Sequence, residues 1–389
     1  MPDLLRHVRA LADEIGPRGA TGAGEAQAAR YVAKVAHSFT HQVWTEPFRS
    51  CASAVWSQAL VLATALVAGL LLSPFPALSL TMGLLAAVFF VDMGSGRFDL
   101  GWVLARNESQ NVVAVVPARL TIRERLVLVA YCDTGLESPP RRWLAGTSWL
   151  RATAGAVLLL PLLSALRLLV PQPAWGWLAL PAVGMVAGAI AADLRHRWLG
   201  RPTCGAAAGA AGVAVALQSG TILARQPLRH TEVWLVFTGC RESGMAGVRA
   251  FLDRHGHMLA DAHFVMLDSL GRGRLAYTLS EGPIRPLAAD AGMVSLVRSV
   301  TGEHPEWGVT GIRAAGRHSQ ASAALVRGYR AITLLAAEPG GGTPAQPPPG
   351  DPSGAVDPVL LHNAVRLVTA LAEQIDRRTC PDLEAGGAG

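Results

Sequence analysis

The sequence is poor in charge. Asp, Glu, Lys and Arg make up only 16% of its 389 residues, whereas soluble globular proteins carry about 25%. Hydrophobic residues make up 51%, which is ample material for a core and excludes intrinsic disorder. The shortage of charge therefore argues against an ordinary soluble enzyme and suggests that part of the chain is not in water.

Lysine and paired cysteines are also scarce. Lys34 is the only lysine, and the net charge of +6 comes from 34 basic and 28 acidic residues. In so apolar a chain a basic excess is more typical of the flanks of membrane segments than of a nucleic-acid surface, so no nucleic-acid partner is expected. The cysteines form no CxxC pair and no even set, which favours a reducing compartment; they stand at positions 51, 132, 204, 240 and 380.

No charged residue occurs between Arg49 and Asp92. The apolar runs 56–72 and 78–91 in this stretch are separated by Ser-Pro-Phe-Pro, which breaks helices. With flanking residues, each run approaches the roughly 17 to 25 residues that cross a bilayer. The stretch 51–93 is therefore predicted to be a transmembrane helical hairpin.

A second apolar region covers 146–194, with Pro171 and Pro173 near its middle. Arg151 and Arg167 lie near the ends of its first arm, where long side chains can reach the headgroups. Its second arm begins with tryptophans suited to a membrane interface. A buried hairpin of a soluble protein is the alternative, but apolar runs of this length usually span a membrane. Four spans are therefore predicted in total.

The flanking arginines predict the orientation of these spans. They lie on the side that the termini share, so the positive-inside rule places the termini and the polar domain in the cytoplasm, at a bacterial-type inner membrane. Residues 1–16 are not a signal peptide, because their apolar positions follow helical spacing between charges. The tail 381–389 is expected to be disordered. The arginines are Arg49, Arg97, Arg141, Arg142, Arg195, Arg197 and Arg201.

The polar segments 1–50, 94–145 and 195–380 alternate between strand and helix patterns. This alternation predicts a three-layer α/β/α fold with a mixed, mostly parallel sheet, into which the two hairpins are inserted. Ligand chemistry is then expected at the carboxyl ends of the strands, where Asp133, Glu242 and Asp268 fall. Strands are expected at 41–48, 110–118, 125–135, 232–239, 263–271 and 329–337, with a helix entered at 205–217, another after 244 and a last one from Pro358.

The order of the motifs in these segments resembles that of the M28 zinc aminopeptidases. The similarity covers the polar part of the chain, and the hairpins fall between motifs. The resembling segments are Gly16-Pro17-Arg18, Asn111 with 112–114, 130–134, 205–212, 241–247, 266–271 and 328–334. The resemblance implies two zinc ions, held by histidines and carboxylates, and a glutamate that deprotonates a metal-bound water.

The same resemblance places unsuitable residues at the chemical positions. Tyr131 stands where the first histidine ligand belongs, and Ala208 replaces the bridging aspartate. Arg241 stands at the general base, and 340–358 holds no final histidine. Glu242 and Asp268 remain as vestigial metal ligands, and Asp133 remains as the residue that orients the missing histidine.

These replacements predict that metallopeptidase activity is lost. Arginine is permanently cationic and cannot accept a proton. We therefore hypothesise that Arg241 takes the electrostatic place of the metal and pairs with Glu242 or Asp268. No catalytic residue and no cofactor are expected, with zinc at the two carboxylates as the alternative. Cys132, Cys204 and Cys240 are interpreted as small buried hydrophobes, although they could rebuild a ligand set, and His318 as a loop residue.

The preferred function is a membrane-anchored, non-catalytic peptidase-like protein that acts in binding or assembly. One alternative is an active hydrolase with a remodelled site, using a single metal or a cysteine nucleophile. Another is a scaffold subunit of a membrane transport or biosynthetic complex, although no carboxylate lies in the middle of a span to relay protons. The expected partners are the lipid bilayer and a membrane protein or a second copy of the chain.

Overall fold

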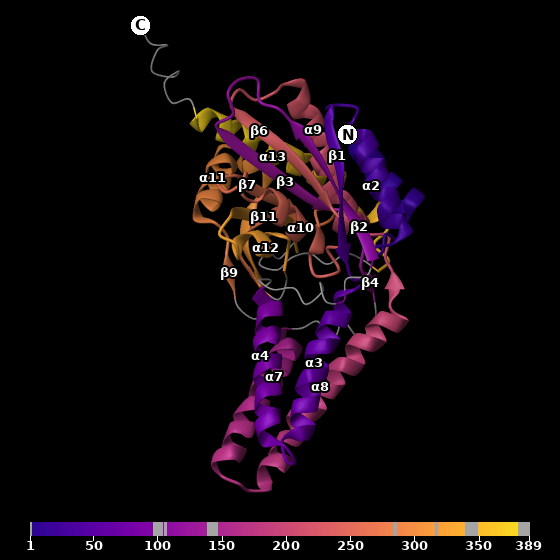
Figure 1. Cartoon of the computed structure of the whole chain (residues 1–389). Helices are drawn as coiled ribbons and strands as arrows, with labels where there is room; N and C mark the ends of the chain where they lie inside the picture. The colour runs from indigo at the N-terminus through magenta and orange to yellow at the C-terminus, as the bar shows by residue number, and fades with distance from the viewer. Residues whose placement is uncertain are drawn as a thin grey trace.

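The computed structural model describes residues 2–95, 104, 107–137, 147–282, 286–315, 318–338 and 349–379. These residues form an α/β domain and a bundle of four long helices that projects from one end of it (Figure 1). The predicted tail 381–389, most of the loop after Ala337, and Arg97, Arg141 and Arg142 lie outside the described residues.

The α/β domain is built on one mixed sheet. Its four middle strands are mutually parallel, and antiparallel strands flank them on both sides. This arrangement confirms the predicted fold class. In spatial order the strands are β1 (Gln42–Ser50), β2 (Asn107–Val116), β6 (Thr231–Thr238), β3 (Glu124–Tyr131), β7 (His263–Leu267), β11 (Arg330–Ala337), β8 (Arg274–Gly282) and β10 (Thr310–Ala315), and β9 (Leu287–Ala288) pairs with β8.

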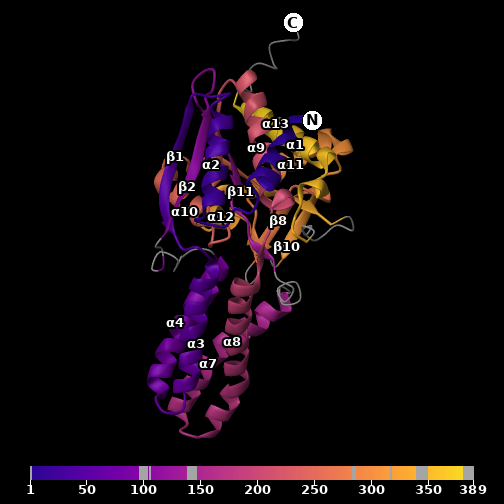
Figure 2. The ribbon, with the colours of Figure 1, turned by 90° about the vertical axis from the view of Figure 1, so that its right-hand side faces the viewer.

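Alternate residues of the strands feed two cores, because successive side chains of a strand point to opposite faces. Val113 and Val115 pack toward one layer of helices, whereas Ala114 and Val116 pack toward the other. Figure 2 shows the sheet between the two layers. The first layer is α10 (Ala246–His255) and α12 (Ala321–Leu325), and the second is α1 (Pro2–Arg9), α2 (Ala23–Ala36), α9 (Ala211–Arg225), α11 (Ala291–Glu303) and α13 (Pro358–Arg378).

Some element limits differ from the sequence-based expectation. The strand expected over 125–135 ends at Tyr131, and that expected over 263–271 ends at Leu267. Ser269 adopts a positive φ of 53°, which turns the chain out of the sheet. The segment that forms β8, α11 and β10 was not predicted to hold any element. Its strands are specified by pairing with β11 and with each other, which local sequence does not reveal.

The bundle consists of α3 (Ala54–Leu71), α4 (Pro76–Ser95), α7 (Thr147–Leu169) and α8 (Ala174–Leu199). Each helix packs mainly against two others, and α3 also contacts α7, so the four enclose a common core. The hydroxyls of Ser79 and Ser164 hydrogen-bond across this core at 2.7 Å, and Gly83 lets α4 lie directly against Pro161. Large apolar side chains cover the outside, including Leu70, Val88 and Leu162. The bundle is thus apolar both inside and out.

In the part of the chain that the structure describes, five helices are long and apolar enough to cross a membrane. One of them, Ala206–Arg225, contains α9 and has 78% of its apolar window buried, against 22 to 44% for the four bundle helices. Since α9 is covered by the sheet, α1 and α13, it is a core helix of the α/β domain. Among the described helices that are long and apolar enough, the four of the bundle therefore leave most of their apolar surface exposed.

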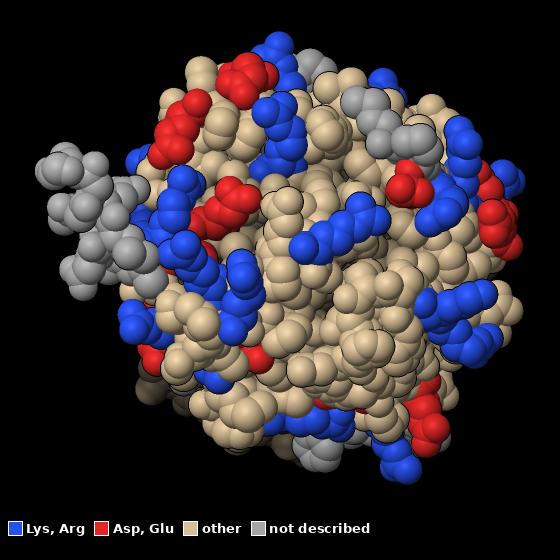
Figure 3. Space-filling view, turned by 90° about the horizontal axis from the view of Figure 1, so that it is seen from above, with Lys and Arg blue, Asp and Glu red and all other residues tan. Residues whose placement is uncertain are grey.

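The chain passes between the two parts at the carboxyl ends of the parallel strands. β3 leads through the two-residue strand β4 (Leu136–Glu137) toward α7, and α8 returns through β5 (Arg201–Pro202), which pairs with β4. β1, which runs parallel to the middle strands, leads into α3. The end of the sheet where ligand chemistry was expected therefore faces the bundle. The opposite face of the molecule carries interspersed basic and acidic side chains (Figure 3).

Candidate functional site

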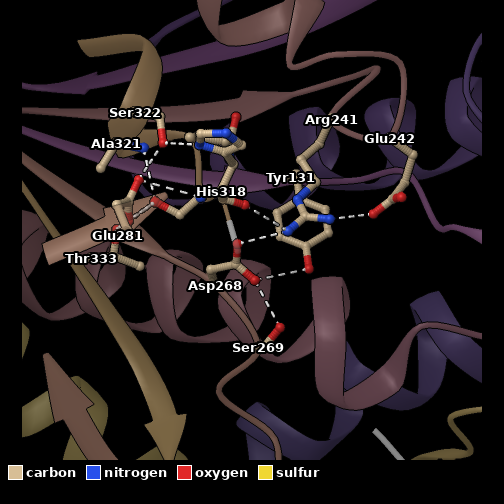
Figure 4. A network of polar contacts seen from close by, with 12 residues as sticks. Tyr131, Arg241, Glu242, Asp268, Ser269, Glu281, His318, Ala321, Ser322 and Thr333 are labelled. Carbon is tan, nitrogen blue, oxygen red and sulfur yellow. Dashed lines mark hydrogen bonds and ion pairs between the residues drawn. The ribbon is translucent and has the colours of Figure 1, made fainter. Parts of the chain in front are cut away.

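Arg241 is at the centre of the candidate site. It follows β6, and its guanidinium forms ion pairs with Glu242 and with Asp268, whose Oδ2 lies 3.1 Å from Nη2. The guanidinium also lies over the ring of Tyr131, 4.9 Å from its centroid. Figure 4 shows Arg241 between the two carboxylates. The expected pairing is therefore confirmed, and it involves both carboxylates.

These neighbours fix the charge of Arg241. Burial alone lowers the pKa of its guanidinium, but the negative charges of Asp268 and Glu242 outweigh burial and raise it well above the ordinary value. A permanently protonated group at this position cannot remove a proton from water. Arg241 is consequently unfit to be a general base.

Tyr131 and Ser269 complete the surroundings of Asp268. The Tyr131 hydroxyl donates to Asp268 Oδ1 at 3.3 Å, and the Ser269 hydroxyl donates to the same oxygen at 2.7 Å. Together with the ion pair to Arg241, these donors stabilise the ionised carboxylate of Asp268. Tyr131, which stands where the resemblance implies a histidine, thus contributes an aromatic face and a hydrogen-bond donor.

Asp133 positions the turn that carries Arg241. Its side chain is fully buried, and its two oxygens accept the backbone N–H groups of Arg241 at 2.9 Å and of Glu242 at 2.8 Å. Burial and the charges of Glu25 and Glu242 raise the pKa of Asp133 to about 7, against the effect of these two hydrogen bonds. Asp133 therefore orients a backbone turn in place of the histidine implied by the resemblance.

Ala208 lies in the short π-helix η2 (Ala206–Ala210). Its carbonyl accepts the backbone N–H of Ser269, the residue after Asp268, so Ala208 lies close to Asp268. The backbone N–H groups of Ala207 and Ala208 donate to the carboxylate of Asp351 at 2.8 and 3.0 Å. Asp351 was missed by sequence reasoning, and its only local signal is the turn sequence Gly-Asp-Pro. It belongs to the region expected to supply a histidine, and it supplies a buried carboxylate that caps η2.

A second buried carboxylate, Glu281, lies beside the site and was also missed. It accepts hydrogen bonds from the hydroxyls of Ser322 at 2.6 Å, Ser319 at 2.7 Å and Thr333 at 3.2 Å. His318 contacts the same group through Ser322, with Nδ1 2.9 Å from its hydroxyl. The cavity between Glu281 and Asp268 measures about 10 Å³, which holds roughly one water molecule.

Replacing Glu281 by glutamine is expected to flatten the dependence of stability on pH. Burial raises the pKa of Glu281, so its folded form holds a proton that the unfolded form releases near pH 4.5. Its contribution to stability is therefore present at low pH and is lost as pH rises through the folded pKa. The difference in Tm between Glu281→Gln and wild type should therefore shift in favour of the variant from pH 5 to pH 8. The amide does not ionise, and the neighbouring hydroxyls can reorient to hydrogen-bond with it. A Tm difference independent of pH would contradict this assignment.

Arg18, from the Gly-Pro-Arg motif, ties the ends of several elements together. Its side chain is fully buried. Nε donates to the carbonyl of Cys132 at 2.8 Å, and the other nitrogens donate to further carbonyls, those of Leu11, Gly16, Cys204 and Gly205. Arg18 is therefore a structural residue of the site's framework.

Glu25 and Asn111 hold the other side of the Arg241 turn. Glu25 is buried and accepts the N–H of Cys240 at 2.6 Å and the hydroxyl of Ser109 at 2.8 Å. Asn111 accepts the N–H of Gly239 and donates to the carbonyl of Gly247. Glu25 of α2 and Asn111 of β2 thus both hold the turn after β6 that carries Arg241. The order of residues in the sequence did not indicate this role for Glu25.

The cysteines do not rebuild a reactive centre. Cys132 and Cys240 are buried free thiols, and Cys204 is a partly buried one. Burial raises the pKa of Cys132 to about 12 and also raises that of Cys240, so the nucleophilic thiolate is disfavoured at both positions. Within the described residues, no three His, Cys, Asp or Glu side chains are grouped so that they could hold a metal. Two carboxylates already paired with a guanidinium do not fit a two-zinc centre.

No protein-family model matches the sequence, and no curated protein sequence matches it. Solved structures match over 96% of the chain. BSAP, a zinc aminopeptidase from Bacillus subtilis, is 12% identical over 94% of its own length, with a TM-score of 0.58. A glutaminyl cyclase from Bacteroides thetaiotaomicron, bound to N-acetylhistamine, is 13% identical over 97% of its length, with a TM-score of 0.55. LapB from Legionella pneumophila is 10% identical over 72% of its length, with a TM-score of 0.55. The chain therefore has the zinc-aminopeptidase fold expected from its motifs.

Proposed function

We propose that this chain is a membrane-anchored protein with an aminopeptidase fold that has lost metal-dependent chemistry and serves in binding or assembly. The observation that carries the proposal is the position of the Arg241 guanidinium, which pairs with both Glu242 and Asp268. A zinc ion at these carboxylates would have to displace a buried cation that they already neutralise. The cavity of about 10 Å³ between Asp268 and Glu281 has room for roughly one water molecule, which supports the proposal.

The bundle supports the proposed membrane anchor. Trp177 near the beginning of α8 and Trp198 near its end are both strongly exposed. Trp198 follows Trp177 by 21 positions, which corresponds to about 30 Å of helix at 1.5 Å per residue, the thickness of a bilayer's hydrocarbon. Trp56 and Trp149 lie near the beginnings of α3 and α7, at the same end of the bundle as Trp198. Exposed tryptophans at both ends suit two membrane interfaces.

Metal content and activity test the loss of chemistry. The full chain, purified in detergent and incubated with excess zinc, is expected to retain well under one zinc per chain after gel filtration and to release no amino acid from aminopeptidase substrates. BSAP, carried through the same steps, is the positive control. Stoichiometric zinc together with cleavage that a chelator abolishes would refute the proposed loss of activity.

A further inference from the structure

Arginines gather where the bundle meets the α/β domain. Arg49 is near the end of β1, shortly before α3, and Arg151 is in the first turns of α7. Arg195 and Arg197 are in the last turns of α8, and Arg201 is in β5. We call the set Arg49, Arg151, Arg195, Arg197 and Arg201 the arginine collar. Four of its members are exposed, and Arg197 is partly exposed. The collar lies at the end of the bundle that adjoins the α/β domain.

The arginines of the collar form no ion pairs within the described structure. None of its five guanidiniums forms an ion pair with a described carboxylate, whereas Arg125, Arg254 and Arg327 elsewhere in the domain do. The nearby carboxylates are already engaged: Asp92 and Asp193 have interaction partners, and Glu137 accepts the N–H of Gly350. At the other end of the bundle the connections 72–75 and 170–173 contain no charged residue. Arg167, in the last turn of α7, is the one described basic residue near that end, so most of the positive charge of the bundle lies at the end next to the α/β domain.

Apolar side chains accompany the collar at the same level. Trp198 is 70% exposed, Leu199 is 63% exposed and Trp56 is 42% exposed. An exposed tryptophan beside free guanidiniums is unfavourable as a water-facing surface, but it matches the boundary between acyl chains and headgroups. The mixture also distinguishes a lipid from a free anion, which would gain nothing from the apolar neighbours.

We propose that the arginine collar binds the phosphates of anionic phospholipids in the leaflet next to the α/β domain. The inference rests on the proposed membrane anchor. Guanidiniums donate well to phosphate oxygens, and each basic residue near an anionic membrane surface contributes about fivefold in affinity. Bound lipids would hold the carboxyl-end face of the sheet, with Arg241 and its partners, against the membrane surface. Ligands of that face would then arrive along the membrane.

Lipid titrations of the detergent-purified full chain test the proposal. Dioleoylphosphatidylglycerol is expected to raise Tm at lower concentration than dioleoylphosphatidylcholine does, and added salt should weaken the difference. The double variant Arg195→Gln with Arg197→Gln should need about 25-fold more phosphatidylglycerol, at about fivefold per arginine. Arg225→Gln with Arg229→Gln, which removes two exposed arginines from the α9 end away from the bundle, is the matched control and should behave as wild type. Inorganic phosphate should not replace the lipid.

Different outcomes test the lipid-binding collar, the membrane anchor and the loss of metal-dependent chemistry. Equal responses to the two lipids, or a collar variant with the wild-type midpoint, would overturn the collar assignment. Release of the chain from vesicles by alkaline carbonate would instead overturn the membrane anchor, and with it the collar. Neither result depends on zinc content, which tests the loss of chemistry separately.

Discussion

Arg241→Met is expected to destabilise the α/β domain by about 3 kcal/mol, because it leaves the Asp268 carboxylate in the interior without its cation. The Arg241 side chain is 14% exposed and that of Asp268 is 8% exposed, so water can replace little of the lost interaction. Glu242, at 33% exposed, can turn to solvent and adds less. For a domain of this size the loss corresponds to a fall in Tm of roughly 6 to 12 °C, measurable by circular dichroism in detergent.

Two further variants make this result specific. Arg241→Met combined with Asp268→Asn should recover part of the stability, since removing both charges leaves no uncompensated ion. Arg366→Met removes an exposed arginine that lies over Trp307 and should change stability by no more than about 0.5 kcal/mol. Arg241→Glu should be less stable than Arg241→Met, because it adds a third carboxylate. A stable Arg241→Glu protein that binds zinc would show that Arg241 is not a substitute for the metal.

Arg18→Met is expected to be at least as damaging, with a loss of about 4 kcal/mol or more. The variant removes the Arg18 donors from five carbonyl groups in three separate parts of the chain. The carbonyls of Leu11 and Gly205 also accept backbone N–H groups, so the loss falls mainly on the other three. An unsatisfied buried acceptor costs about 1 to 3 kcal/mol, although neighbouring groups and water recover part of that cost. The expected phenotype is poor folding, seen as a low yield of monodisperse protein and a reduced Tm.

Arg18→Lys should rescue this loss only in part. Lysine keeps the charge but has three donors on one atom, which cannot reach carbonyls placed around a planar guanidinium. Arg30→Met, at an exposed position of α2, serves as the control for losing an arginine. If Arg18→Met retained wild-type stability, the network would not hold the site's framework together, and the motif's arginine would need another explanation.

Local patterns in the sequence were sufficient for part of the site. Glu242 is next to Arg241 in the chain, and Asp268 follows a parallel strand, so both were expected at the same edge of the sheet. The missed groups, Glu25, Glu281 and Asp351, depend on contacts between distant segments. Glu25 reaches Cys240, 215 positions away, and Asp351 reaches Ala207, 144 positions away. A single acidic residue in a polar segment carries no local sign of such burial.

The sequence by itself determined the class of the fold, the two inserted apolar hairpins and the residue types at the expected chemical positions, because each depends on residue type, spacing or order along the chain. Tertiary structure decided how the remaining charges are used. It placed Arg241 between two carboxylates rather than beside one, and it buried Arg18 among backbone carbonyls. It also separated α9, an apolar helix of the core, from the four bundle helices. Burial and long-range pairing depend on which surfaces meet, and only the folded chain determines that.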